Sequence, residues 1–134
     1  MFCNDPFGYA YLDPAGFRAS PLPKYIFSLV ETTDFLAVSA ISCWELVLLS
    51  RRGRVKLPIS VDGWIERGLR PVNIQCLPLN ERILVLAASL PAHHRDPADR
   101  MIIATAIEHD AALLSLDATF SDYAASSGLK LIVE

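Results

Sequence analysis

Apolar and polar residues along this chain alternate between the spacing of strands and the spacing of helices. The predicted strands are Phe2–Asn4, Phe35–Ser39, Val72–Leu77, Ala112–Leu116 and Leu129–Val133. The predicted helices are Pro21–Glu31, Ala40–Arg52, a short helix from Ser60 through Gly68, Asn80–Leu90, a helix from Asp96 onward, and Ala118–Ser126. This order predicts a three-layer α/β/α fold, with helices on both faces of a mostly parallel central sheet of four to five strands.

Local signals fix several helix ends. Ser20-Pro21 and Asp96-Pro97 each combine a capping side chain with a proline at the first helical position, and Asn80 is a third capping residue. Gly53 follows the last residue of its helix and ends it. These residues place the helix boundaries more firmly than the apolar spacing alone.

Length and composition indicate one globular domain over residues 1–134, because 52% of the residues are hydrophobic. The apolar runs are too short for a membrane span, and no signal peptide opens the sequence. Cys3, Cys43 and Cys76 are few, odd in number and widely spaced, so we expect reduced cysteines in a cytoplasmic protein. The net charge of −3 does not by itself indicate a nucleic-acid partner.

Four carboxylates occupy positions where parallel strands end or helices begin. They are Asp5, Glu45, Asp99 and Asp117. Because ligands of open α/β sheets bind beyond the carboxyl ends of the strands, we expect the four acids at one rim.

Each acid also has a purely structural interpretation. Asp5 and Asp117 fit as N-caps, Ser42 and Glu45 have the spacing of a capping box, and Asp99 complements a helix dipole. The helical faces argue against this for two of them. Glu45 has Ile41, Leu48 and Leu49 as its helical neighbours, and Asp99 has Ile102, Ile103 and Ala106.

A carboxylate on an apolar face is costly unless something compensates its charge. A divalent cation held by several carboxylates compensates it, and Mg²⁺, with Mn²⁺ as a substitute, prefers such oxygen ligands. A site of this kind suits phosphodiester hydrolysis, in which the metal activates a water molecule and stabilises the leaving oxygen. The acids therefore predict a metal-dependent nuclease with one or two ions.

Three segments resemble the VapC-type ribonuclease toxins of the PIN-domain family. They are AVSAISCWE, which ends at Glu45, HHRDPADR, which ends at Arg100, and LLSLDATF, which ends at Phe120. Gly53-Arg54 with Leu57-Pro58 resembles a further family segment. The resemblance runs from about Ser20 to the C-terminus in the family's order and spacing.

The resemblance implies a PIN fold and a Mg²⁺-dependent endoribonuclease toxin that cuts RNA, often tRNA or mRNA. It also implies a homodimer and inhibition by a VapB-like antitoxin. Glu45, Asp99 and Asp117 match the family's acids, and Ser39 matches a small polar residue that lines the site. Arg100 matches an arginine that contacts the backbone or a neighbouring acid, and Asp96 belongs to the same segment.

The first 19 or so residues depart from the family pattern. Asp5 is preferred as the first acid because its spacing to Ser20-Pro21 and Glu45 fits. Asp13 is the rival, since it follows the more convincing strand pattern YAYL. Pro6 replaces the usual small residue after the acid and fixes φ there, which bears on the geometry of the first acid.

Other residues invite a function but also have ordinary explanations. His93 and His94 either shape the rim and contact RNA phosphate or are solvated loop residues. The basic run at Arg51, Arg52, Arg54 and Lys56 either binds an RNA backbone or complements a helix C-terminus. Trp44 and Trp64 are interpreted as core or interface residues and not as stacking platforms for bases.

Two other functions compete with an active nuclease. The first is a PIN-like module with an impaired metal site, which binds antitoxin or RNA without cleavage. The second is a small-molecule or nucleotide-binding α/β domain, which the absence of a GxGxxG or Walker A loop disfavours.

Overall fold

The structure is a computed structural model that describes residues 2–3, 32, 36–54, 59–69, 74–91, 95–114, 120 and 130–132. The strands in this part of the chain are β1 (Phe2–Cys3), β2 (Leu36–Ser39), β3 (Ile74–Leu77), β4 (Ala112–Leu114) and β5 (Lys130–Ile132). The helices are α2 (Ala40–Arg51), α3 (Val61–Leu69), α4 (Glu81–Ser89) and α5 (Pro97–Glu108). The helices predicted before β2 and after β4 lie outside the described residues.

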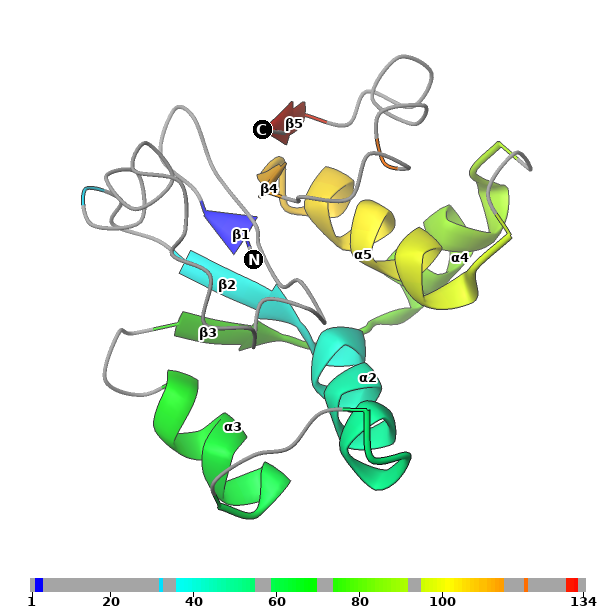
Figure 1. The fold of residues 1–134 in the computed structure, drawn as a ribbon. Coiled ribbons are helices and arrows are strands. Elements are labelled where there is room, and N and C mark those ends of the chain that lie inside the picture. The colour runs from blue at the N-terminus through cyan, green and yellow to red at the C-terminus, as the bar shows by residue number, and fades with distance from the viewer. Residues whose placement is uncertain are drawn as a thin grey trace.

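The five strands form one sheet in the order β3-β2-β1-β4-β5, as Figure 1 shows. β2 pairs with β3 and β4 pairs with β5 in parallel, so four of the five strands share one direction. The predicted α/β fold with a mostly parallel sheet is therefore confirmed.

Strand β1 runs against both of its neighbours. Phe2 lies opposite Ala37 of β2, and Cys3 lies opposite Leu36. The carboxyl end of β1 is therefore at the edge of the sheet where β2 begins. The sequence pattern did not predict this direction, because apolar alternation looks the same in parallel and antiparallel strands.

Among the described residues, two parts of the hydrophobic core meet on α5. One joins the sheet to α5 through fully buried residues such as Ala37, Ile103 and Leu113. The other joins α4 to α5 through Ile83, Ala87 and Ala104. Helix α5 is thus packed on two sides, and Figure 1 shows α4 and α5 side by side.

Helix ends follow the predicted caps. The Asn80 side chain accepts a 3.0 Å hydrogen bond from the Ile83 N–H and begins α4. Gly53 takes a positive φ of 69° after α2, which lets the chain close the helix with two backbone hydrogen bonds to its last turn. A residue with a side chain is disfavoured at this angle, which explains why glycine ends α2.

Candidate functional site

Glu45 lies in the second turn of α2. Its helix begins at Ala40 because the Ser39 hydroxyl, at the end of β2, accepts a 3.3 Å hydrogen bond from the Ile41 N–H. Ser39 is therefore the N-cap, and the capping box suggested for Ser42 and Glu45 is wrong. The Glu45 carboxylate lies beyond the first turn, so the cap of α2 does not account for it.

Asp96 and Asp99 form the start of α5. The Asp96 carboxylate accepts hydrogen bonds from the backbone N–H groups of Ala98 (2.9 Å) and Asp99 (3.4 Å) and caps the helix. Asp99 is in the first turn and half-buried, whereas Asp96 is exposed. The cap holds the backbone at Asp99 and leaves the Asp99 carboxylate for other contacts.

These two helices place Asp96 and Asp99 within electrostatic reach of Glu45. Helix α2 packs against α5, and burial raises the pKa of Glu45 from 4.5 to about 7, with further contributions from the negative charges of Asp99 and then Asp96. A cation bound nearby would offset this repulsion. Carboxylate oxygens are the ligands that a hard divalent ion prefers, so Glu45 and Asp99 have the chemistry to contribute to such a site.

Arg100 fastens the start of α5 to the end of α4. Its Nε donates to the carbonyl of Ala87 (3.0 Å), and its two terminal nitrogens donate to Pro91 (3.0 Å), Ala88 (3.2 Å) and Leu90 (2.7 Å). The last carbonyl groups of a helix have no partner within the helix, and one guanidinium satisfies them here. Of the two partners expected for Arg100, the backbone is confirmed. Because Asp99 precedes it, the same clamp helps fix the position of Asp99.

Comparison with known proteins identifies the family to which this domain belongs. The sequence pattern of the PIN domain matches residues 15–126. The chain belongs to the PIN domain family.

Relatives agree with this assignment. The PIN chain is 37% identical over 89 residues to Ribonuclease VapC22 of Mycobacterium tuberculosis (strain ATCC 25618 / H37Rv), a match that covers 66% of this chain and 67% of that protein. The resemblance to the VapC type, seen in the sequence segments, is therefore confirmed.

Solved structures agree on the fold. The structure of VapBC2 from Rickettsia felis bound to a promoter DNA fragment matches with a TM-score of 0.67 at 15% identity, covering 93% of this chain and 98% of that one. The structure of FitAB bound to an IR36 DNA fragment matches with a TM-score of 0.61 at 17% identity, covering 93% of each chain. At these identities the likeness supports the PIN fold.

Several predicted site residues of this PIN domain lie outside the described residues. They are Asp5, Asp13, His93, His94 and Asp117. Among the residues that the structure does describe, no group of three or more acidic, histidine or cysteine side chains is close enough to hold a metal ion. The four-acid cluster therefore stays a prediction, with Glu45 and Asp99 as the half that the structure describes.

Ser39 is fully buried, and its observed contact is the cap of α2. A role in lining the site stays a prediction. Within the described ranges, no helix has the length and apolar character needed to cross a membrane.

Three features of this region were not predicted from the sequence. Asp96 was given only a supporting role, although its negative charge acts on Glu45. Cys43 was not paired with Cys76, although burial and then Cys76 raise the pKa of the Cys43 thiol to about 12. Trp44 was predicted to lie in the core or at an interface, and its 54% exposure contradicts only the core. Of the three, Asp96 alone had a sequence signal, its spacing of three from Asp99.

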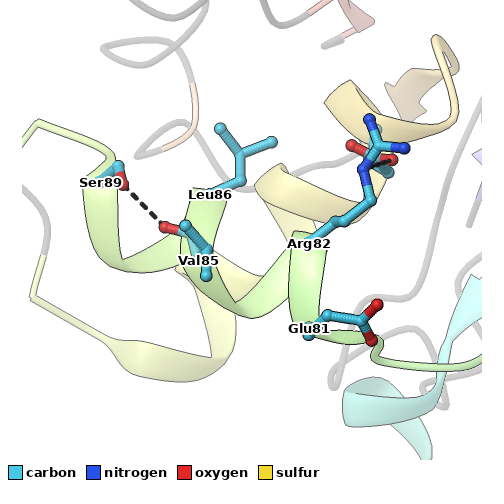
Figure 2. A pocket seen from close by; sticks show the side chains of 6 residues that line it. Glu81, Arg82, Val85, Leu86 and Ser89 are labelled. Carbon is cyan, nitrogen blue, oxygen red and sulfur yellow. Dashed lines mark hydrogen bonds and ion pairs between the residues drawn. The ribbon is translucent and has the colours of Figure 1, made fainter.

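A separate hollow of about 410 Å³ lies on α4 and α5 (Figure 2). Its lining is Glu81, Arg82, Val85, Leu86, Ser89 and Glu108. Arg82 and Glu108 form a 3.1 Å salt bridge across it. None of the three clustered acids lines this hollow, so it is distinct from the candidate site.

Proposed function

We propose that this PIN domain is a metal-dependent endoribonuclease toxin of the VapC type, which cleaves RNA phosphodiester bonds. The observation that carries the proposal is the pair formed by Glu45 on α2 and Asp99 on α5: burial, and then the charge of Asp99, raises the pKa of Glu45 to about 7. The ribonuclease named among its relatives supports the same reaction class.

In this proposal Glu45, Asp99, Asp5 and Asp117 hold Mg²⁺, for which Mn²⁺ substitutes. The ion supplies Lewis acidity: it polarises a phosphoryl oxygen and lowers the pKa of a bound water. The chain supplies position. Asp96 caps the helix beneath Asp99, and Arg100 anchors that helix to α4, so the Asp99 carboxylate is held in place before substrate arrives.

Glu45 supplies a group whose charge depends on its surroundings. With its pKa raised to about 7, mainly by burial, Glu45 binds a proton far more readily near neutral pH than an ordinary glutamate does. Glu45 would ionise more readily with a cation held at the site. His94, on the adjoining segment, is proposed to contact substrate phosphate at the rim.

The proposed partners follow from the same family. In this proposal the chain is a single PIN domain, and two copies of it form a homodimer. A VapB-like antitoxin binds and neutralises the toxin in the cytoplasm. The structural neighbours were solved as VapBC2 and FitAB assemblies, which supports an antitoxin partner.

The test is RNA cleavage by purified protein with Mg²⁺ or Mn²⁺, with EDTA as the metal-free arm. We expect cleavage with either ion, none with EDTA, and at least a hundredfold loss in Asp99→Asn. Asp62→Asn is the matched control, because Asp62 is an exposed acid in the first turn of α3. Full activity of Asp99→Asn would exclude the proposal.

A PIN-like module without catalysis is the second candidate, and the direction of β1 favours it. Because β1 is antiparallel to β2, its carboxyl end lies at the edge opposite to the one where Ser39 leads into α2. Asp5 follows that end of β1, so the strand does not lead toward Glu45. Calorimetry separates the candidates: this module takes up no Mn²⁺, whereas the nuclease does, and Asp99→Asn reduces the uptake.

A further inference from the structure

The outward side of α2 combines an aromatic ring with positive charge. Trp44 is 54% exposed and directly precedes Glu45. Arg51 ends the helix, Arg52 is its C-cap, and both side chains are exposed. Within the described part of the chain, neither arginine forms a salt bridge. We call Trp44, Arg51 and Arg52 the α2 strip.

Helical geometry puts the strip in line with the acids. Residues seven apart on a helix share a face, so Arg51 follows Trp44 and Arg52 follows Glu45 on neighbouring faces. Seven residues rise about 10 Å along the axis, against about 3.4 Å for each nucleotide of a stacked strand. The strip therefore spans a few nucleotides, with the acids at one end and the arginines at the other.

Ordinary explanations account for only part of this arrangement. A helix C-terminus favours cations, which explains one or two arginines. It does not account for the aromatic ring of Trp44, which is 54% exposed on the same helix and directly precedes Glu45. The acids also repel any polyanion that approaches them, so a substrate of this kind needs positive groups nearby to hold it.

We infer that the α2 strip binds single-stranded RNA next to the acid cluster, with a base stacked on Trp44 and phosphates held by Arg51 and Arg52. Single-stranded nucleic acids are bound by this combination of aromatic platforms and cations. The inference rests on the proposed function for the identity of the substrate, and it assigns Trp44 the stacking role that the sequence alone disfavoured.

The experiment measures binding separately from cleavage. Fluorescence anisotropy with a labelled single-stranded RNA of mixed sequence, in EDTA, gives the Kd without turnover. We expect Trp44→Ala to weaken binding about fivefold or more and Trp44→Phe to keep most of the affinity, since phenylalanine also stacks. In Arg51→Ala/Arg52→Ala, the slope of log K against log salt falls by about 1.4, or about 0.7 for each lost phosphate contact.

Two controls make the result specific. Arg82→Ala removes one exposed arginine on α4, away from the strip, and should leave the Kd within about twofold. Poly-glutamate carries negative charge without bases, so it should bind more weakly than RNA and show no dependence on Trp44. An equal loss in Arg82→Ala, or equal competition by poly-glutamate, would overturn the inference.

Cleavage assays separate this inference from the proposed function. With metal present, the strip variants should raise KM and leave kcat near the wild-type value. If the protein binds RNA through the strip but does not cleave it, the inference about the strip is supported and the proposed nuclease activity is excluded. If the protein cleaves RNA and the strip variants have unchanged Kd and KM, the nuclease activity is supported and the inference about the strip is excluded.

Discussion

Helices α2 and α5 each contribute acids to the candidate site and each have 12 residues, but they are held very differently. Helix α5 buries five residues, shares both parts of the core and is anchored through Arg100. Helix α2 buries only Ser42 and Leu46. Asp99 is therefore held by the packing and capping of its helix, whereas the charge of Glu45 depends on what neutralises the acids around it.

The largest expected effect is on the stability of the contact between α4 and α5, which Arg100 anchors. Arg100→Ala leaves four carbonyl groups without their donor, and we expect the free energy of unfolding to fall by about 3 kcal/mol. Arg100→Lys should recover only a small part, because one ammonium group does not reach four acceptors. Urea denaturation measures both values.

Arg82→Ala is the matched control for Arg100. The Arg82 side chain is 74% exposed, and its salt bridge with Glu108 is at the surface, so the loss should stay below about 1 kcal/mol. If Arg82→Ala and Arg100→Ala cost the same, Arg100 does not anchor α5 and the comparison between the helices fails.

The next effect concerns the charge of Glu45. Its pKa in the folded protein, about 7, lies above the ordinary 4.5, so the folded state binds the extra proton. Stability in EDTA should therefore fall as the pH rises from 4.5 toward 7 and then level off. Glu45→Gln should remove this fall and stabilise the metal-free protein at pH 8 by about 1–2 kcal/mol, after allowance for solvent screening.

Thermal unfolding measured across this pH range shows whether stability falls or rises with pH. Mn²⁺ should reverse the preference, so that the wild type becomes more stable than Glu45→Gln at pH 8, because a cation favours the ionised carboxylate. Asp62→Asn, at an exposed site on α3, should show neither behaviour. A wild type that gains stability as the pH rises through this range would contradict the proposed crowding of acids.

A smaller effect separates the two roles of Asp96. Asp96→Ala removes the cap of α5 at a cost of about 1 kcal/mol, whereas Asp96→Asn keeps a capping oxygen. Both substitutions remove a negative charge and should lower the pKa of Glu45, measured by NMR titration. Asn80→Ala, the cap of α4, should cost a similar amount and leave that pKa unchanged. An Asp96→Asn protein with an unaltered Glu45 pKa would show that Asp96 only caps.

The smallest expected effect is on the rate at which the Cys43 thiol is chemically labelled. The pKa of the Cys43 thiol is about 12, so very little thiolate is present at neutral pH and alkylation by iodoacetamide should be slow. Cys76 is exposed and should be modified first. Peptide mapping by mass spectrometry measures both rates. If α2 is the more adjustable helix, Mn²⁺ should slow the modification of Cys43 further, and an unchanged rate would weaken that part of the comparison.

The parts of the structure that were predictable from sequence are those with local signals. Asn80, Asp96 and Gly53 mark helix ends because each acts on backbone groups within a few residues. Glu45 and Asp99 were singled out because each carries a charge on an apolar helical face, and the charge of Asp99 does act on the pKa of Glu45. Their role as metal ligands stays a prediction. The roles of Asp5 and Asp117 in the site stay predictions.

The remaining features depend on long-range geometry. The direction of β1 is set by which strands it pairs with, and the contact between Cys43 and Cys76 by how α2 lies against β3. The exposure of Trp44 was not predictable because α2 is apolar on nearly every side, so its sequence does not show which side faces water. The four acceptors of Arg100 are backbone carbonyls, which no side-chain pattern reveals.

Those four acceptors also shape how the sequence around the site can vary. A carbonyl oxygen is present whatever the side chain, so Arg100 imposes no residue type on its partners. Ala88, whose side chain is exposed, can therefore be exchanged for many others while the anchor stays intact, whereas Ala87 and Leu90 are constrained by burial alone. Related chains can diverge freely at such positions and still keep the same attachment, provided that the arginine itself remains.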